Sequence, residues 1–149
     1  MYKTQESGTV SKNGKRFTDR IKLGKVASTI VGIDFYENKM GARNIVGLQT
    51  SYSANGSIKK SVVNMIHDPK MAERVSFQLE DKSDYIKDIE LIINEASVIV
   101  GIRTTSRNGV SFSAGCSEGT RRPLNIPNNG HPACFFGSFC HDGLELFGC

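Results

Sequence analysis

The feature that most constrains the fold is a unit that occurs twice along the chain, at residues 30–56 and again at residues 86–109. Each copy holds two runs rich in β-branched residues, separated by a polar break and closed by an Asn-Gly pair, Asn55–Gly56 or Asn108–Gly109. Such runs favour strands, and Asn-Gly accepts the positive φ angles of a hairpin turn. A repeat at a spacing of about 50 residues therefore predicts an architecture assembled from equivalent β-hairpin units.

Within these two copies the strands correspond one to one. The first strand is Ile33–Tyr36 in one copy and Ile89–Ile92 in the other. The second strand is Ile45–Leu48 in one copy and Ile99–Ile102 in the other. Because both strands and the closing turn match in order, we interpret the two stretches as the same structural unit.

A fainter third copy closes the chain, as Cys134–Gly137 followed by Asp142–Gly143. With this alignment, Gly47, Gly101 and Gly137 fall at matching places in the three copies. A glycine inside a strand marks a bulge or a close approach of another backbone. Since the glycines recur in every copy, we expect them to mark places where the sheets pack tightly rather than ligand contacts.

Further short strands are expected between and around the copies. Alternating apolar and polar residues place them near residues 17–23, 59–64, 75–79, 110–114, 124–126, 133–139 and 144–148. One short helix is expected over Asp68–Arg74, because Asp68 can cap it and Pro69 suits the first helical position. Roughly ten to twelve short strands with almost no helix predict an all-β protein built from hairpins.

The length of 149 residues suits one domain, and the net charge of +4 is unevenly distributed. Residues 1–28 hold seven lysines and arginines against two acidic residues, a local charge of +5. We interpret residues 1–13 as a basic polar N-terminal arm and residues 14–149 as the domain. The basic residues are scattered, so no nucleic-acid partner is expected; a solvated edge is favoured over contact with an anionic membrane or an acidic protein.

No apolar run approaches the roughly 20 residues that a membrane-spanning helix needs. The first residues also lack the apolar core of a secretory signal. We therefore expect no transmembrane segment and an intracellular, cytoplasmic location. In that compartment the four cysteines, Cys116, Cys134, Cys140 and Cys149, are expected to stay reduced.

His131, Cys134, Cys140 and His141 form the sharpest chemical cluster in the sequence. Zinc accepts such a donor set, but Cys140 and His141 are adjacent, whereas the ligands of a structural zinc pair usually have residues between them. Cys134 also alternates with Phe136 as a packing residue would. We expect structural cysteines, no metal and no cofactor. The chain carries no nucleophile elbow, phosphate loop or metalloprotease helix, and we expect it not to be an enzyme.

The order and spacing of several landmarks resemble the jacalin-related lectins. The landmarks are Gly14–Asp19, Ile30–Ile33, Asn44–Gly47, Tyr85–Ile86, Val98–Ile102 with Thr104–Thr105, Phe135–Gly137 and Leu144–Gly148. The resemblance covers roughly residues 14–149. It implies three four-stranded antiparallel sheets arranged as a triangular prism with approximate threefold symmetry. It also implies non-enzymatic binding of carbohydrate by loops at one end of that prism.

The same resemblance implies a set of sugar-binding residues. In these lectins the sugar lies between an early glycine loop and a last hairpin whose aspartate accepts hydrogen bonds from sugar hydroxyls. Glu145 aligns with that aspartate, and His141 stands where the lectins carry a glycine. The candidate carbohydrate-binding residues are Gly14, His141, Asp142, Gly143, Leu144 and Glu145. Asp142–Gly143 is the alternative source of the acceptor and the turn.

Two functions follow from this sequence. The first is a carbohydrate-binding domain that recognises glycans of the mannose or galactose type. The second is a structural or adaptor subunit that keeps the lectin fold without sugar binding and contacts protein partners in a larger assembly. The altered hairpin and the basic arm favour the second, and the resemblance favours the first. Either function is compatible with an oligomer.

Overall fold

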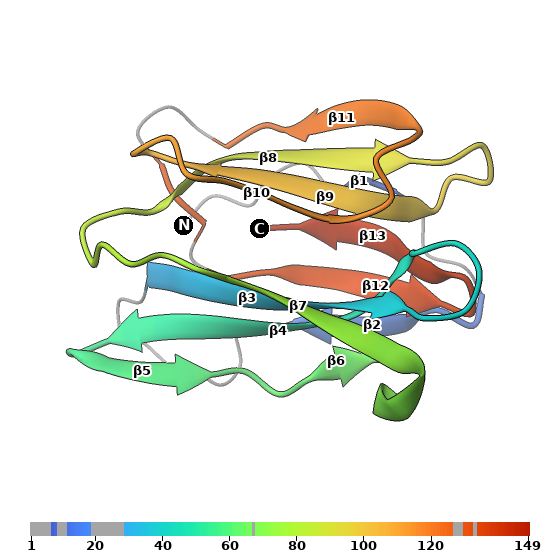
Figure 1. The fold of residues 1–149 in the computed structure, drawn as a ribbon, viewed down its shortest axis with the longest axis horizontal. Helices are drawn as coiled ribbons and strands as arrows, with labels where there is room; N and C mark the ends of the chain where they lie inside the picture. The colour runs from blue at the N-terminus through green and yellow to red at the C-terminus, as the bar shows by residue number, and fades with distance from the viewer. Residues whose placement is uncertain (1–6, 9–11, 19–28, 67, 127–129, 133) are drawn as a thin grey trace.

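A computed structural model describes residues 7–8, 12–18, 29–66, 68–126, 130–132 and 134–149. These residues form an all-β structure with one short 3₁₀ turn, η2 (Pro69–Met71). The strands, shown in Figure 1, are β1 (Ser7–Gly8), β2 (Lys15–Thr18), β3 (Thr29–Asn38), β4 (Ile45–Ala54), β5 (Ser57–Lys60), β6 (Asn64–Met65), β7 (Ala72–Gln78), β8 (Ile86–Ile93), β9 (Ile99–Ser106), β10 (Ser111–Gly115), β11 (Thr120–Leu124), β12 (Phe136–Cys140) and β13 (Gly143–Gly148). The predicted all-β class is confirmed.

Hydrogen bonding groups the described strands into two sheets. The smaller has the order β5-β4-β3-β7, with β6 also paired to β4. The larger has the order β11-β8-β9-β13-β12-β2, with β10 on β9 and β1 on β13. Strands β9 and β13 are joined by one residue pair, Ile99 with Leu144. The larger sheet is therefore two groups of four antiparallel strands that meet at a narrow junction.

The two strong sequence repeats occupy equivalent places in the fold. The hairpin β3–β4 is flanked by β7 on the side of its first strand and by β5 on the side of its second. The hairpin β8–β9 is flanked in the same order by β11 and β10. Asn55–Gly56 connects β4 to β5, and Asn108–Gly109 connects β9 to β10. The predicted correspondence between these copies is therefore seen strand by strand.

The predicted third copy is wrong in its alignment. The third hairpin, β12–β13, has β2 beside its first strand and β1 beside its second. Asp142–Gly143 lies inside this hairpin, so it corresponds to the turns within β3–β4 and β8–β9 and not to the Asn-Gly turns. Gly137 accordingly lies on a first strand, whereas Gly47 and Gly101 lie on second strands. Because no Asn-Gly pair follows β13, the sequence comparison matched the similar pair Asp142–Gly143 with the Asn-Gly turns of the other two copies.

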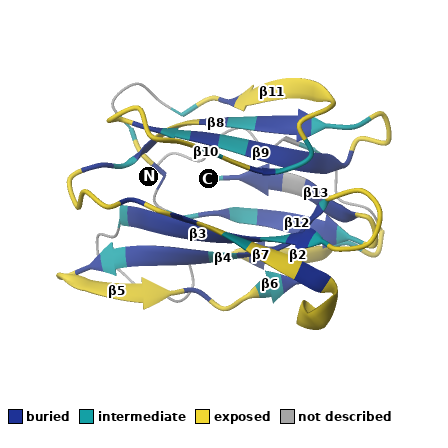
Figure 2. Cartoon of the chain, viewed as in Figure 1, coloured by how far each residue is buried: buried dark blue, intermediate teal, exposed yellow. Residues whose placement is uncertain are grey.

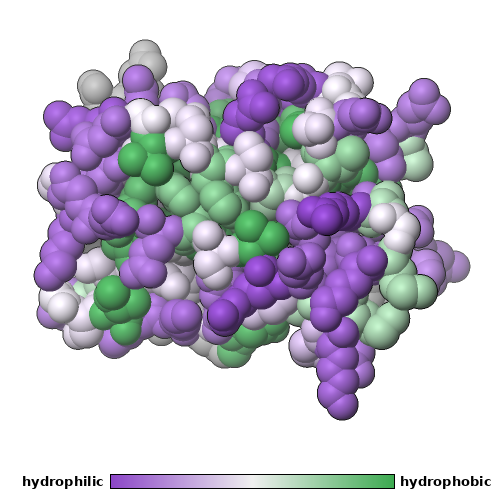
Figure 3. Space-filling model, viewed as in Figure 1, coloured by the Kyte–Doolittle hydropathy of each residue, from purple (hydrophilic) through white to green (hydrophobic). Residues whose placement is uncertain are grey.

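The core lies between the sheets and is filled by the central hairpins. Figure 2 shows β3, β4, β8 and β9 largely buried and the outer strands β5 and β11 largely exposed. Phe17 of β2 stacks on Phe139 of β12 with 5.2 Å between ring centroids. Between β10 and the smaller sheet, Phe112 stacks on Phe77 at 5.1 Å, and Figure 3 shows apolar atoms reaching the surface across this part of the face. The Phe112–Phe77 contact joins the two sheets, whereas the Phe17–Phe139 contact joins paired strands within the larger sheet; both contacts bury apolar surface.

Two expected elements differ from the structure. The helix expected over Asp68–Arg74 is limited to the single turn η2, where the Asp68 carboxylate accepts a hydrogen bond from the Lys70 N–H. From Ala72 onward the chain pairs with β3 instead, because this pairing buries Phe77 and outweighs helix propensity. The strand expected at 124–126 is β11, which begins earlier and tolerates Pro123 because it lies at the edge of the sheet.

The expected strand at 17–23 is described only as β2, and Ile21 and Leu23 lie outside the described residues. Part of the expected N-terminal arm is described, since Ser7 and Gly8 pair with Phe147 and Leu146 of β13. Among the residues that the structure describes, no helix has the length and apolar character needed to cross a membrane.

Candidate functional site

The turns inside the three central hairpins lie at one end of the molecule. Leu144, at the start of β13, pairs with Ile99, at the start of β9. A Cβ atom on Gly143 would lie 2.8 Å from the carbonyl oxygen of Ile45, at the start of β4. The turns 39–44, 94–98 and 140–143 therefore share the end at the right of Figure 1. The predicted site residues of the last hairpin belong to this end.

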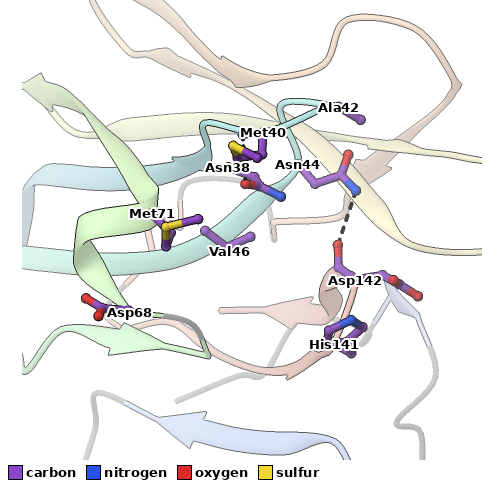
Figure 4. A pocket seen from close by; sticks show the side chains of 9 residues that line it. All are labelled: Asn38, Met40, Ala42, Asn44, Val46, Asp68, Met71, His141 and Asp142. Carbon is purple, nitrogen blue, oxygen red and sulfur yellow. Dashed lines mark hydrogen bonds between the residues drawn. The ribbon is translucent and has the colours of Figure 1, made fainter.

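A hollow of about 420 Å³ opens at this end, between the turn of β3–β4, the turn η2 and the turn of β12–β13. Figure 4 shows its polar side chains, Asn38, Asn44, Asp68, His141 and Asp142, and its apolar ones, Met40, Ala42, Val46 and Met71. Three segments far apart in the sequence thus contribute to one concave surface. Such convergence of a few polar groups in a hollow is typical of a binding site.

One hydrogen bond ties two walls of the hollow together. The side-chain Nδ2 of Asn44 donates to the carbonyl oxygen of Asp142 across 3.1 Å, as the dashed line in Figure 4 shows. The adjoining Gly143 has a φ of +131° and approaches the backbone of Ile45 so closely that a side chain would collide. The turn of the last hairpin is therefore held against the start of β4 by both a hydrogen bond and a backbone contact.

The hollow is rich in acceptors. The carboxylates of Asp68 and Asp142 belong to exposed residues on different walls. One oxygen of Asp68 is used by the N–H of Lys70, and the Asn38 oxygen accepts from the N–H of Met40 across 3.1 Å. The Met40 side chain is 68% exposed. A ligand here would meet carboxylate oxygens, amide groups and flexible apolar side chains, which suits a polyhydroxylated molecule.

The structure places the predicted site residues in two different environments. Gly14 immediately precedes Lys15, which pairs with Phe139, so Gly14 lies beside the end of β12. His141 and Asp142 line the hollow, and Gly143 closes the turn. Leu144 is fully buried in the core. These positions bring Gly14 and the turn to the same end of the molecule.

Glu145, the residue aligned with the lectin aspartate, lies inside the protein. Glu145 is 5% exposed, and its Oε1 accepts a hydrogen bond of 2.8 Å from the Ser138 hydroxyl. Ser138 is itself fully buried on the neighbouring strand β12. The carboxylate therefore holds two strands of the hairpin together, which the alignment did not predict.

Asn38, Asn44 and Asp68 were not among the predicted site residues. Asn38 was expected first as a turn residue and second as a ligand contact, and Asp68 was expected as a helix cap, which are the usual roles of Asn and Asp at such places. The pairing of Leu144 with Ile99 and the close contact of Gly143 with Ile45 bring these residues to the last hairpin. Both contacts join segments that are distant in the sequence, so local sequence patterns do not predict them.

His131 and His141, the two histidines considered as zinc ligands, lie at opposite ends of the molecule. The His131 ring lies against Tyr85, which precedes β8, with 5.5 Å between centroids, whereas His141 lines the hollow beyond β12. Within the described residues, no three His, Cys, Asp or Glu side chains lie close enough to hold a metal ion.

The end opposite the hollow carries a second polar network, built around Asp81 and Asp84. The Oδ1 of Asp84 accepts hydrogen bonds from the N–H groups of Tyr85 at 2.9 Å and Asn108 at 3.1 Å. Burial raises the pKa of Asp84, but hydrogen bonds from Ser106, Asn108 and Tyr85 outweigh it and leave the pKa below its ordinary value. The backbone and hydroxyl of Ser83 lower the pKa of Asp81. These carboxylates shape the Asn108–Gly109 turn and are already engaged within the fold.

Comparison with solved structures identifies the architecture. Frutapin, a lectin from Artocarpus incisa, superposes with a TM-score of 0.76 at 18% identity, with 99% of this chain and 93% of that chain covered. A mannose-specific jacalin-related lectin from Morus nigra, solved with mannose, gives 0.75 at 18% identity, covering 99% and 91%. Frutalin from Artocarpus incisa gives 0.75 at 24% identity, covering 99% and 92%.

No protein-family model matches the sequence, and no curated protein matches it. The resemblance to jacalin-related lectins is confirmed by the structure, in which nearly the whole chain adopts their fold. At these identities the likeness concerns the fold.

Proposed function

We propose that this protein is a non-enzymatic carbohydrate-binding protein of the jacalin-like kind, which uses the end that carries Gly14 and the turn 140–143. The three groups of strands, each a central hairpin with outer strands on both sides, support a three-sided prism with pseudo-threefold symmetry. In this proposal residues 1–13 are an arm, of which Ser7 and Gly8 pair with β13, and residues 14–149 form the prism. An intracellular location, where the cysteines stay reduced, belongs to the same proposal.

The chemistry of the hollow supports a sugar ligand. The carboxylate of Asp142 accepts hydrogen bonds from hydroxyl groups, and the amides of Asn38 and Asn44 offer both donors and acceptors. Met40 and Met71 supply apolar surface for the C–H face of a sugar ring. Asp142 replaces Glu145 as the expected acceptor, because the carboxylate of Glu145 is engaged by Ser138.

The observation that carries the proposal is the convergence of Asn44 and Asp142 on one hollow at the end expected from the resemblance. The test is calorimetric titration with mannose, galactose and their oligosaccharides, after a glycan array has identified the type. Asp142→Ala is expected to weaken binding at least tenfold, since it removes a charged hydrogen-bond acceptor. Asp88→Ala, an exposed carboxylate on β8, is the matched control and should bind like the parent protein.

One observation favours the second function, a structural or adaptor role. The hydrogen bond from Ser138 holds the residue aligned with the lectin acceptor inside the sheet. If folded protein binds no glycan on the array, the adaptor role replaces sugar binding. A glycan that binds equally to the parent and to Asp142→Ala would place the sugar site elsewhere on the fold.

A further inference from the structure

The edge formed by β5 and β6 displays an unusual concentration of aliphatic side chains. The described residues expose six large hydrophobic side chains, and three lie within six consecutive positions. These are Ile58, Val62 and Val63, with exposed fractions of 59%, 48% and 42%. Single exposed aliphatic residues need no explanation, but three within one short edge segment favour an interaction surface.

The backbone explains why two adjacent valines point outward. The N–H of Ser61 donates to the carbonyl of Thr50, and the Ser61 hydroxyl accepts from the N–H of Thr50. The Gln49 side chain also donates to the carbonyl of Ser61 across 2.8 Å. Ser61 therefore fastens the chain to β4 between β5 and β6, and the residues after it leave the ladder. Val62 and Val63 project from this bulge at the edge.

Basic side chains surround the aliphatic ones. Lys59 and Lys60 lie on β5, and the Lys60 side chain is 55% exposed although its ammonium lies 3.8 Å from the Asp34 carboxylate. Lys15 of β2 donates to the carbonyl of Met65 across 3.4 Å, so β2, with exposed Lys15 and Arg16, lies beside the far end of the same edge. Figure 1 shows β5 and β6 in line along β4.

This combination disfavours an added protein strand. A four-residue edge strand with two lysines and a bulge is how sheets prevent edge-to-edge pairing. The same consideration opposes pairing of β5 with a second copy, because the lysines would face each other. Edge protection does not account for Ile58, Val62 and Val63, since exposed aliphatic groups promote association instead of preventing it.

We propose that the edge Ile58–Val63, with Lys15 and Arg16 beside it, is a docking surface for an anionic lipid bilayer. The aliphatic side chains would enter the boundary between headgroups and acyl chains, while the lysines remain at the level of the lipid phosphates. Such shallow insertion combined with basic charge is the usual mode of peripheral binding. The surface is separate from the hollow and does not depend on the proposed sugar binding.

The experiment is co-sedimentation of the full chain with vesicles of phosphatidylcholine alone and of phosphatidylcholine with 30% phosphatidylserine, as a rough test composition, both without glycolipid. Binding is expected to the anionic vesicles and to fall with added salt. Lys59→Ala with Lys60→Ala should weaken it about fivefold for each lysine. Val62→Ser with Val63→Ser should also weaken it, whereas Val110→Ser, an equally exposed valine on another turn, should not.

Three results would overturn the proposal. The first is no sedimentation with anionic vesicles. The second is equal binding to both kinds of vesicle, and the third is equal binding by the Val62→Ser, Val63→Ser variant. Sedimentation equilibrium on the same proteins tests whether a second copy of the chain occupies the edge instead. If the parent protein is a dimer and the Val62→Ser, Val63→Ser variant is a monomer, the edge is assigned to a second copy. Matching circular dichroism melts show that each variant is folded.

Discussion

The hydroxyl of Ser138 donates a 2.8 Å hydrogen bond to Oε1 of Glu145, linking two buried side chains on neighbouring strands of the last hairpin. The link lies next to the register shift between Ser138 and Phe139 on β12. An irregular ladder leaves fewer backbone hydrogen bonds to hold the two strands, so a side-chain hydrogen bond at that point stabilises their register. Glu145 is therefore a structural residue of the hairpin that carries the candidate site.

Glu145→Ala is expected to lower the free energy of unfolding by about 1–3 kcal/mol, because it leaves the buried Ser138 hydroxyl without this acceptor. Glu145→Gln keeps an acceptor oxygen at the same distance along the side chain and should cost less. Urea denaturation of the three proteins measures the difference. If Glu145→Ala is as stable as the parent protein and yet loses glycan binding, Glu145 is a sugar ligand and the structural role is wrong.

Asn44→Ala is expected to weaken glycan binding by about threefold to tenfold, the factor that corresponds to losing one ordinary hydrogen bond. The reason is that the turn bearing Asp142 loses the hydrogen bond that holds it against β4. Asn94→Ala is the matched control, since Asn94 accepts from the N–H of Val98 in the turn of β8–β9 but does not line the hollow. Titration calorimetry compares the two.

In that comparison both variants should lose some stability, and the affinity should fall only for Asn44→Ala. Equal affinity for all three proteins would show that the Asn44–Asp142 hydrogen bond does not position the site.

Much of the fold was predictable because it is encoded locally. Runs rich in β-branched residues located β3, β4, β8 and β9, although each strand extends several residues beyond its run, and Asn55–Gly56 and Asn108–Gly109 marked real turns. The failures also have local causes. The segment Asp68–Arg74 has a capping Asp68 and a Pro69 that suits the first helical position, yet pairing with β3 and burial of Phe77 decided the outcome.

The candidate site was predictable only in part, because it depends on contacts between distant segments. His141 and Asp142 were found through the last hairpin, which the resemblance made visible. Asn44 lies 98 positions from Asp142 in the sequence, and its donor role exists only once the two hairpins meet. The burial of Glu145 was missed for the same reason: alignment assigns a residue its relative's role without showing what its side chain touches.

Gly143→Ala is expected to destabilise the protein by roughly 2–4 kcal/mol, because a methyl group there would lie 2.8 Å from the Ile45 carbonyl oxygen at a φ that side chains rarely adopt. Gly109→Ala is the control. Gly109 also has a positive φ, but its missing side chain faces open space, so the cost is limited to about 1–2 kcal/mol of backbone strain. Thermal and urea denaturation report both, and equal costs would contradict the close contact at Gly143.

Asp84→Asn should make the free energy of unfolding fall less steeply as the pH is lowered. The hydrogen bonds from Ser106, Asn108 and Tyr85 hold the pKa of Asp84 below its ordinary value in the folded protein. The unfolded chain therefore binds the proton first, so the stabilising contribution is complete above the unfolded pKa and disappears as pH falls through the folded one.

The affected window lies below about pH 4, the ordinary range of an aspartate. The experiment is a series of urea denaturations from pH 6 downward on the parent protein and on Asp84→Asn, in which the amide oxygen still accepts from the two N–H groups. The slope of unfolding free energy against pH should be smaller for the variant. Asp88→Asn reports the effect of removing an exposed carboxylate near the same end of β8. Parallel slopes for the parent protein and Asp84→Asn would show that the network around Asn108 does not favour the ionised carboxylate.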